Sequence, residues 1–247
     1  MTDDRRDLEG TVVVITGAAG GIGGATARQV LAAGGRIVAG DLREEALAPL
    51  RDEWGADRVA VVGGDSRLEA TADALTDAGV AAFGRVDSVV ANAAIGFYGG
   101  LLDYSPSDIE LMVDLNVKGT IWLARAALRQ FRTQGVGGDI VILGSVAGLL
   151  IGGGQEAVYA ATKGAQINLG TALDRELRAE GIRTTVIAPA GVNTPFAAAD
   201  GRFGDADPAQ GPFMRPDDIA GAIVYTLRQP RRMRTELWTM WSLAEQH

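Results

Sequence analysis

The 247-residue sequence contains no cysteine and a single histidine, His247. Without cysteine the chain can form neither disulfides nor thiolate metal sites, and it has no thiol nucleophile. With one histidine it lacks the residues for a His-based catalytic triad or a His-rich metal site, so we expect no metal centre. Proton transfer must therefore rely on tyrosine, lysine, serine or carboxylate side chains.

A long apolar run is also missing. The longest uncharged stretch, IVILGSVAGLLIGGGQ (140–155), is rich in glycine and shorter than a bilayer requires. The first ten residues, MTDDRRDLEG, are charged and contain no apolar segment typical of a signal peptide. We therefore expect a cytoplasmic protein that does not bind membranes.

Positive charge is scarce, because 23 Lys and Arg stand against 31 Asp and Glu and give a formal net charge of -8. Such an acidic chain is a poor partner for nucleic acid or an anionic membrane, and we predict that it binds neither. The length and the hydrophobic content of 47% are sufficient for one sizeable core. The sequence therefore predicts a single domain over residues 1–247.

The chain does contain a regular alternation of apolar runs and Ala-rich helical patterns. Runs typical of strands covered on both faces lie at 11–16, 36–40, 58–62, 86–91, 139–144, 183–188 and 235–240. Helical patterns lie at 21–34, 43–54, 67–82, 107–133, 157–180 and 216–228. This order predicts an α/β fold, a Rossmann-like doubly wound parallel sheet of seven strands with helices on both faces. The stretch 194–215 has no clear periodicity and is interpreted as a substrate lid or as a surface excursion.

A glycine-rich turn follows the first predicted strand. The letters TGAAGGIG (16–23) place Thr16, Gly17, Gly21, Ile22 and Gly23 between a buried strand and an amphipathic helix. A pyrophosphate can approach the backbone where no Cβ intrudes, and a helix N-terminus attracts its negative charge. The turn therefore predicts a dinucleotide site, with a tight turn that binds no ligand as the alternative.

Two carboxylates follow the next two predicted strands. Asp41 can accept hydrogen bonds from the adenosine ribose and repel a 2′-phosphate, which favours NAD over NADP. Arg43 could instead bind that phosphate, and Asp41 could cap the next helix. Asp65, followed by Ser66, either reaches the adenine amino group or is an ordinary turn residue.

Tyr159 and Lys163 lie four residues apart in VYAATKGA, so a helix would present them on one face. A nearby ammonium favours the phenolate, and such a phenol can exchange a proton with an alcohol or a carbonyl. A tyrosine packed over a lysine stem is the simpler alternative.

Ser145 ends the fifth strand, where it can hydrogen-bond a substrate oxygen. Asn116 is unfavourable within a helix, and either anchors a water that links Lys163 to solvent or marks a kink or a buried amide.

Together these motifs resemble the short-chain dehydrogenase/reductase family over about residues 10–228. The parts follow the family's order, with the letters ANAA (91–94) between the glycine turn and Asn116. The resemblance implies that Tyr159 is the general acid/base, that Ser145 orients the substrate, and that Lys163 makes the phenol more acidic and binds the nicotinamide ribose.

The resemblance implies further roles around the cofactor. Asn116 would hold a water of the proton relay, Asn92 would support the sheet beside the cofactor, and Val192 and Thr194 would contact the nicotinamide carboxamide. The sequence departs from the family pattern at Ala94 and Ala190, where glycine is usual, and has one extra residue between Ser145 and Tyr159. The two alanines would each add a methyl group beside the cofactor path, whereas the extra residue falls in a segment expected to line the substrate. The candidates for the substrate pocket or lid are Phe97, Tyr98, Gln155, Phe196 and Phe203, with packing within loops as the alternative. Trp238 and Trp241 would either close the pocket or lie in a subunit interface.

The resulting prediction is a reversible hydride transfer between NAD(H) and a secondary alcohol or ketone, such as a polyol or a small carbonyl compound. One alternative is an NADPH-dependent reductase of 3-oxoacyl thioesters, for which the basic run RQPRRMR (228–234) would bind a carrier protein. A non-catalytic dinucleotide sensor is the alternative from another class. The helices at 107–133 and 157–180 have Ala- and Leu-rich outer faces, so we also expect a homo-oligomer, either a tetramer or a dimer.

Overall fold

The computed structural model describes residues 5–149, 154–199 and 213–244. All seven strands are parallel and form one sheet in the order β3-β2-β1-β4-β5-β6-β7. Their bounds are β1 (Val12–Thr16), β2 (Arg36–Asp41), β3 (Val59–Gly63), β4 (Ser88–Ala91), β5 (Gly138–Leu143), β6 (Ile182–Pro189) and β7 (Leu237–Met240). The predicted Rossmann-like, doubly wound α/β fold is confirmed, and each predicted strand corresponds to one strand of the sheet.

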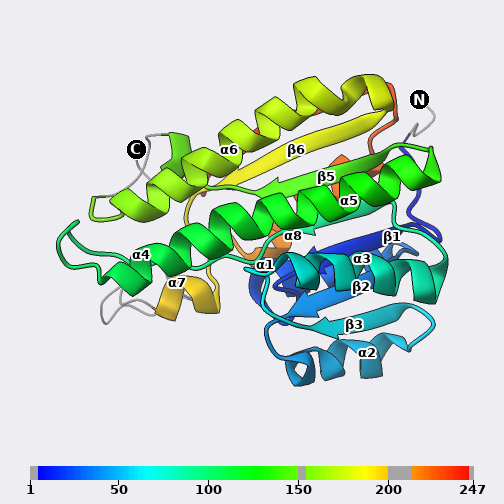
Figure 1. Cartoon of the computed structure of the whole chain (residues 1–247), viewed down its shortest axis with the longest axis horizontal. Coiled ribbons are helices and arrows are strands. Elements are labelled where there is room, and N and C mark those ends of the chain that lie inside the picture. The colour runs from blue at the N-terminus through cyan, green and yellow to red at the C-terminus, as the bar shows by residue number, and fades with distance from the viewer. Residues whose placement is uncertain (1–4, 150–153, 200–212, 245–247) are drawn as a thin grey trace.

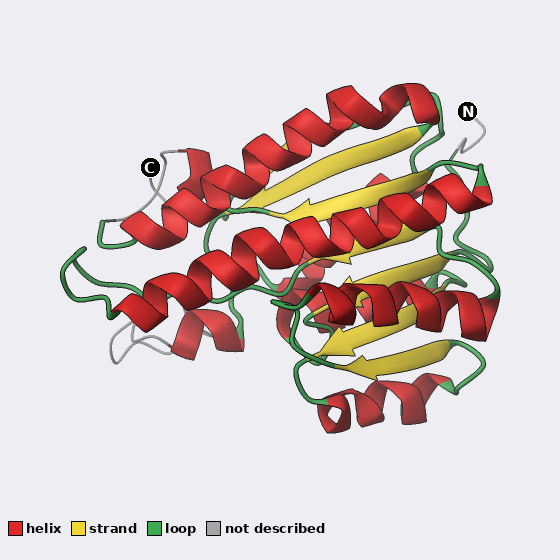
Figure 2. Cartoon of the chain, viewed as in Figure 1, coloured by secondary structure: helices red, strands yellow, loops and turns green. Residues whose placement is uncertain are grey.

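Helices cover both faces of the sheet (Figures 1 and 2). One face carries α3 (Glu69–Phe83), α5 (Thr120–Gln134) and α6 (Ala157–Leu177). The other carries α1 (Gly21–Ala32), α2 (Ala48–Trp54) and α8 (Pro216–Arg228). Because the chain moves outward from β1 to β3 and then returns to β4, the strand order reverses between β1 and β4, where doubly wound sheets bind their ligands.

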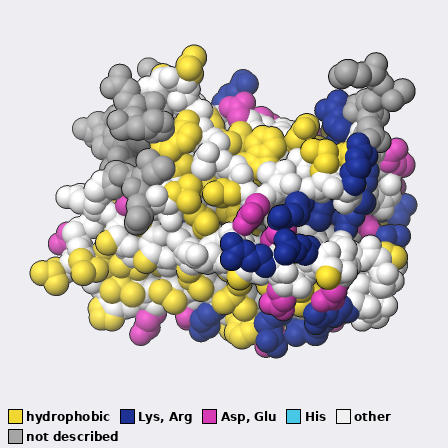
Figure 3. All heavy atoms as spheres, turned by 90° about the horizontal axis from the view of Figure 1, so that it is seen from above, with side chains coloured by type: hydrophobic (Ala, Val, Ile, Leu, Met, Phe, Trp, Pro, Cys, Tyr) yellow, Lys and Arg dark blue, Asp and Glu magenta, His cyan; other side chains and the backbone are white. Residues whose placement is uncertain are grey.

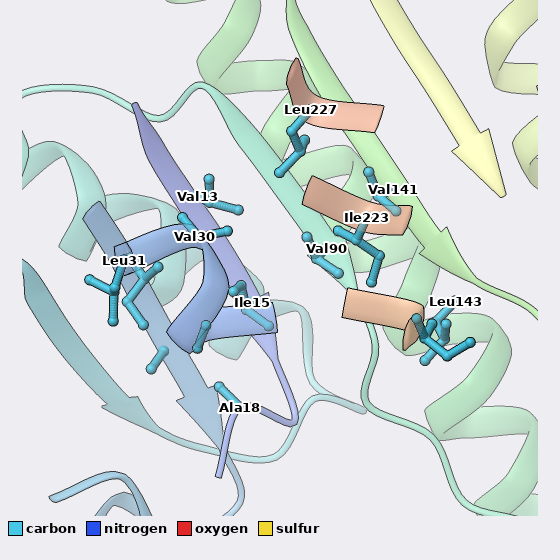
Figure 4. Close-up of a cluster of buried hydrophobic side chains, with 14 of the residues drawn as sticks. Val13, Ile15, Ala18, Val30, Leu31, Val90, Val141, Leu143, Ile223 and Leu227 are labelled. Atoms are coloured by element: carbon cyan, nitrogen blue, oxygen red, sulfur yellow. The ribbon is translucent and has the colours of Figure 1, made fainter. Parts of the chain in front are cut away.

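The core has two layers because successive strand residues point to opposite faces. In β1, Val13 and Ile15 pack toward α1 and α8, whereas Val12 and Val14 pack toward α3 and α5. Figure 4 shows the first layer, in which side chains of α1 and α8 meet those of the strands. Burial on both faces explains why the strands are nearly continuous apolar runs.

Three predicted helices differ from the prediction in detail. The long helix at 107–133 consists of α4 (Pro106–Met112), a π-helical turn η2 (Val113–Gly119) and α5. The helix at 43–54 begins as a 3₁₀ turn, η1 (Glu44–Leu47), because Pro49 near the start of α2 cannot donate a backbone hydrogen bond. The helix at 157–180 comprises α6 and a last 3₁₀ turn, η4 (Arg178–Glu180). A further 3₁₀ turn, η3 (Val146–Leu149), follows β5.

The stretch proposed as a lid is described only at its two ends. Its first residues form a short helix, α7 (Pro195–Ala199), which the sequence pattern did not predict. Val192 pairs with Met214 in an isolated parallel bridge, so the chain entering and the chain leaving the stretch lie side by side. Residues 200–212, including Phe203, lie outside the described part of the chain. Within that part, no helix combines the length and apolarity needed to cross a bilayer.

Candidate active site

A cavity of about 640 Å³ opens at the carboxyl ends of the central strands. Its walls contain the predicted residues Gly17, Gly21, Ile22, Asp41, Asp65, Ser66, Asn92, Ser145, Tyr159, Lys163, Val192 and Thr194. The other three predicted residues, Thr16, Gly23 and Asn116, are absent from the lining. The fold thus brings most of the predicted residues together around one space, although they are spread over nearly 180 positions of the sequence.

The glycine turn forms one wall of this cavity. Gly17 has a φ of +67°, and a Cβ at Gly23 would lie 2.1 Å from the main-chain oxygen of Gly17, so neither position accepts a side chain. Helix α1 begins at Gly21 with no side-chain cap and no acidic residue in its first turn. Its first N–H groups and its positive dipole end therefore face the cavity, which fits a pyrophosphate group.

Thr16 and Asn92 hold this turn against β4 from behind. Asn92 Nδ2 donates to the main-chain oxygens of Thr16 at 2.8 Å and Gly17 at 3.2 Å. Thr16 Oγ1 in turn accepts the N–H groups of Asn92 and Ala93, both at 3.1 Å. The two side chains join the carboxyl ends of β1 and β4, which fixes the wall of the crevice where the strand order reverses.

Asp41 faces the glycine turn from the end of β2. Its Oδ2 accepts the N–H of Ala19 at 3.0 Å, and its Oδ1 accepts the N–H of Leu42 at 2.8 Å. The N-cap residue of η1 is Arg43, with no side-chain cap, so Asp41 does not cap that turn. Arg43 is exposed and does not line the cavity, whereas Asp41 and Leu42 do.

Asp65 is paired with a residue that the sequence reasoning missed, Arg67. The Arg67 side chain donates to both carboxylate oxygens of Asp65, with distances of 2.8 Å from Nε and 2.5 Å from Nη2 to Oδ2. These hydrogen bonds from Arg67 lower the pKa of the Asp65 carboxyl, while burial opposes the shift. Arg67 also lines the cavity, together with Asp65 and Asp41.

Tyr159 and Lys163 lie one turn apart on α6 and both face the cavity. Both are buried, at 6% and 2% exposure, and Lys163 Nζ lies 5.6 Å from the centre of the Tyr159 ring. Lys163 Nζ also donates to the main-chain oxygen of Leu143 at 2.8 Å, which ties α6 to the end of β5. Burial lowers the pKa of Lys163 to about 7, because desolvation disfavours its charged form.

Ser145 and Thr194 also line the cavity. Ser145 is half-buried after β5, where its Oγ accepts the N–H of Ala147 at 3.2 Å. Thr194 Oγ1 accepts the N–H of Ala197 at 3.2 Å at the start of α7. Gly21 lies next to Thr194, since a Cβ at Gly21 would come within 3.6 Å of the threonine methyl group.

Asn116 occupies the π-helical turn and lies behind the cavity. Its Oδ1 accepts the N–H of Ile95 at 2.9 Å, and its Nδ2 donates to the oxygen of Ile95 at 2.8 Å and to Thr162 Oγ1 at 3.0 Å. It is therefore the buried amide that the sequence left as an alternative. Its main-chain oxygen accepts hydrogen bonds from Thr120 Oγ1 at 2.7 Å and from Gln166 Nε2 at 2.8 Å.

Gln166 was not singled out from the sequence. It lies one turn after Lys163, is 1% exposed, and its Oε1 has no hydrogen-bond partner among the described residues. Because Nε2 must face the oxygen of Asn116, Oε1 points elsewhere and needs a donor that the described side chains do not supply. The sequence signal that could have identified Gln166 is a polar amide within an otherwise Ala- and Gly-rich helix.

Aromatic rings pack around Tyr159. The ring centres of Tyr98 and Phe196 lie 5.8 and 6.0 Å from that of Tyr159, and Phe97 packs in the same cluster. The oxygen of Gln155 accepts the N–H of Gly99 at 2.7 Å, so Gln155 secures the loop that carries Phe97 and Tyr98. Trp238 instead packs against Tyr225 and does not line the cavity.

Comparisons with known proteins agree with this architecture. The family model described as short chain dehydrogenase matches residues 11–203. An uncharacterized oxidoreductase of Staphylococcus haemolyticus is 34% identical over 224 residues, which are 91% of this chain and 94% of that protein.

Two solved structures extend the similarity to the fold. The 3-ketoacyl-(acyl-carrier-protein) reductase from Brucella melitensis complexed with NADH has a TM-score of 0.85 and 28% identity, and the match covers 95% of this chain and 97% of that one. A serine dehydrogenase in its closed form complexed with NADP+ has a TM-score of 0.86 and 27% identity, with 93% and 94% covered. With its matched motif, its parallel sheet and its cavity at the reversal of strand order, the chain belongs to the short-chain dehydrogenase family and is an oxidoreductase that acts with a nicotinamide dinucleotide.

Proposed function

We propose that this enzyme transfers a hydride between NAD(H) and a secondary alcohol or ketone, with Tyr159 as the general acid/base. The observation that carries the proposal is the shared orientation of Tyr159 and Lys163, which are buried side by side in the wall of the same cavity as the glycine turn. The dinucleotide, when bound, supplies the hydride chemistry, and the side chains of this chain supply binding, orientation and proton transfer.

The proton passes through Tyr159 in this proposal. In the oxidative direction the Tyr159 oxygen takes the proton of the substrate hydroxyl, and in the reductive direction it returns that proton to the carbonyl oxygen. Ser145 donates a hydrogen bond to the same substrate oxygen and holds it in place. Lys163, with its pKa lowered to about 7 by burial, can accept or release a proton near neutral pH.

Asp41 supports NAD over NADP. Its carboxylate lines the cavity next to the glycine turn, where it would accept hydrogen bonds from ribose hydroxyls and repel a 2′-phosphate. Arg43, the residue that could reverse this preference, is absent from the cavity wall. Arg67 lies at the same end but is engaged with Asp65.

The substrate end of the cavity supports a neutral, largely apolar substrate. Ile95 and Phe196 line the cavity and pack beside Tyr159. In the described wall, Lys163 is the charged side chain near Tyr159, and the others, Asp41, Asp65 and Arg67, lie toward the glycine turn and β3. An apolar carbonyl compound or secondary alcohol fits this surface better than a polyol, whose hydroxyls would lack partners.

The alternative as a reductase of 3-oxoacyl thioesters gains support from the Brucella relative. Its proposed carrier-protein patch, residues 228–234, loses support from the ion pairs of Arg231 with Asp139 and of Arg234 with Asp174. Asp139 lies at the amino end of β5, whereas the cavity opens at the carboxyl ends. A strand of six residues spans about 20 Å, so this patch is remote from the cavity mouth.

Self-association is part of the proposal. The helices α5 and α6 run side by side across one face of the sheet and leave a broad outer surface (Figure 2). A homodimer or homotetramer formed through this surface is the expected assembly. Light scattering coupled to size-exclusion chromatography would give the mass, and a single mass of one chain would contradict the expectation.

The test of the proposal is an assay with apolar ketones and secondary alcohols, each with NAD(H) and with NADP(H), followed by nicotinamide absorbance. Tyr159→Phe should reduce kcat by about 10²–10⁴-fold while binding of the reduced cofactor, read by its fluorescence, is retained. Tyr225→Phe, whose ring packs on Trp238 outside the cavity, is the matched control. Unchanged turnover in Tyr159→Phe would refute the mechanism.

A second variant tests the cofactor. Asp41→Ser removes the carboxylate that repels a 2′-phosphate, so the ratio of kcat/KM for NAD to that for NADP should fall at least about tenfold. Arg43→Ser, at an exposed position outside the cavity wall, should leave the ratio unchanged. A preference for NADP in the unmodified protein would overturn the NAD proposal and leave the role of Tyr159 standing.

A further inference from the structure

A second cavity, of about 240 Å³, lies at the opposite end of the sheet from the active site. It is formed by the end of α6, the start of β6 and the segment that joins α8 to β7. Five arginines and one aspartate contribute to its walls, namely Arg178, Arg183, Arg231, Arg232, Arg234 and Asp174. In a chain with a net charge of -8, this local excess of positive charge needs an explanation.

The local excess of positive charge begins beneath the cavity, where three guanidinium groups contact one carboxylate. Asp139 is 4% exposed and is contacted by Arg183 Nε at 2.6 Å, by Arg231 Nη1 at 2.9 Å and by Arg6 Nη2 at 3.2 Å. One negative charge cannot neutralise three positive ones. Burial, together with repulsion from Arg183 and Arg6, lowers the pKa of Arg231 despite the attraction of Asp139.

Two of the arginines in the cavity wall have donors that the described residues leave unused. The side chain of Arg183 is only 10% exposed, and its Nη2 is buried without a hydrogen-bond partner in this part of the chain. Arg178 is exposed on the rim, and no ion pair or hydrogen bond of its side chain is found among the described residues. A buried cationic donor without an acceptor is costly, so the cavity favours an anion that supplies one.

Asp174 narrows the identity of that anion. It is 1% exposed, its Oδ2 pairs with Arg234, and its Oδ1 is buried without a partner in the described chain. A carboxylate ligand would only repel Asp174. A hydrogen phosphate carries acceptor oxygens for the arginines and an O–H group that can donate to Asp174, so it meets both needs.

We propose that this arginine cavity binds inorganic phosphate as the hydrogen phosphate ion, which keeps an O–H group for Asp174 near neutral pH. The planar guanidinium fork matches the oxygens of a phosphate, and arginine is the side chain that most often binds it in this way. The volume lies below the range of about 300–1,000 Å³ typical of pockets for drug-sized ligands, which fits a small anion. Seen from above, the molecule has most of the Lys and Arg side chains of that face in the right half of Figure 3, with Asp and Glu among them.

The experiment is a thermal-unfolding titration with inorganic phosphate, with sodium chloride at matched ionic strength as the reference. Saturating NAD is present throughout, so that phosphate does not report on the glycine turn. At ten times its Kd, phosphate should raise Tm by about 3–6 °C, because ligands that bind only the folded state stabilise it. Sulfate, which has no proton to donate to Asp174 near pH 7, should bind at least about fivefold more weakly.

A parallel titration with glycerol 3-phosphate near pH 8 tests the role of this proton. The second pKa of a phosphomonoester is about 6, so the ester has no O–H for Asp174 and should bind at least about fivefold more weakly than free phosphate. Tighter binding of the ester would contradict the hydrogen bond to Asp174. No rise in Tm with either compound beyond the chloride reference would overturn the proposal.

A matched pair of variants locates the effect. Arg178→Gln removes a rim arginine and should weaken phosphate binding at least about fivefold, whereas Arg51→Gln should leave it unchanged. Arg51 is a suitable control because it is exposed on α2, beside the opposite edge of the sheet, and has no ion pair in the described chain. Equal phosphate affinity in Arg178→Gln and the unmodified protein would place the ion elsewhere and refute the site. Because Arg178 is exposed, its replacement should leave the fold intact, unlike replacement of the buried Arg183.

Discussion

Gln166 Nε2 lies 2.8 Å from the main-chain oxygen of Asn116, and this hydrogen bond joins α6 to the π-helical turn η2 directly behind the active-site cavity. The contact determines which way the amide points, because Oε1 in its place would face the carbonyl oxygen. It leaves Oε1 buried without a donor among the described residues. A high-resolution crystal structure should therefore show an ordered water at Oε1, and its absence would contradict this.

Gln166→Glu tests the same contact in solution. A carboxylate would face the oxygen of Asn116, so the variant should lose about 1–3 kcal/mol of unfolding free energy near pH 8. Burial and this repulsion raise the folded-state pKa of such a glutamate above its unfolded value, so stability falls as pH rises between the two values. Urea unfolding at pH 5 should show a smaller deficit than at pH 8. Gln130→Glu, at a half-buried position on α5, is the control. If Gln166→Glu lost the same unfolding free energy at pH 5 as at pH 8, the contact would be contradicted.

Burial of Lys163 makes the stability of the cofactor-free protein depend on pH. Its folded-state pKa is lowered to about 7, against an unfolded value of about 10.4, so between these values the unfolded chain binds the extra proton. The free energy of unfolding should therefore rise with pH in this window, by up to about 1.4 kcal/mol per unit. Below the window both states hold the proton, so the free energy of unfolding should no longer change with pH through Lys163. Urea unfolding of the unmodified protein and Lys163→Met from pH 6 to 9 measures the difference. Parallel pH profiles would show that Lys163 is not desolvated.

The glycine turn should tolerate a methyl group at one position and reject it at another. A Cβ at Gly23 would lie 2.1 Å from the oxygen of Gly17, whereas a Cβ at Gly20 meets nothing within 4 Å. Overpacking of this kind costs about 1–3 kcal/mol, so Gly23→Ala should lower Tm by several degrees and Gly20→Ala should not. Thermal unfolding of the cofactor-free proteins is the measurement, and similar Tm values for both variants would contradict the predicted clash.

Asp139 should matter far more to stability than an ion pair on the surface. It is buried beneath three arginines, so Asp139→Asn should cost about 3–5 kcal/mol of unfolding free energy. Asp73 pairs with Arg129 on the surface, where its side chain is 45% exposed. Asp73→Asn should therefore lower the free energy of unfolding by at most about 1 kcal/mol. Chemical denaturation measures both losses. A loss in Asp139→Asn as small as that in Asp73→Asn would show that the arginines do not depend on the carboxylate.

Much of the fold could be predicted because its signals are local. Strands buried on both faces must be continuous apolar runs, as in β1 and β5, and a helix of 3.6 residues per turn must bring Tyr159 and Lys163 to one face. The glycine turn is local as well, since Gly23 contacts Gly17 within the same loop. Motif order then indicated the family, and the family model confirmed it.

Many side chains are contacted by residues distant in the chain. Only the tertiary structure determined these contacts. Asn116 is a buried amide in a π-helical turn because Ile95, Thr162 and Gln166 meet it there, up to 50 positions away. The composition of the run 228–234 indicates a basic surface segment. In the structure its arginines pair with Asp139 and Asp174 and line a cavity. Periodicity fixes which face a residue lies on, but the charge or amide that meets it depends on how the strands and helices are packed together, and no local pattern encodes that.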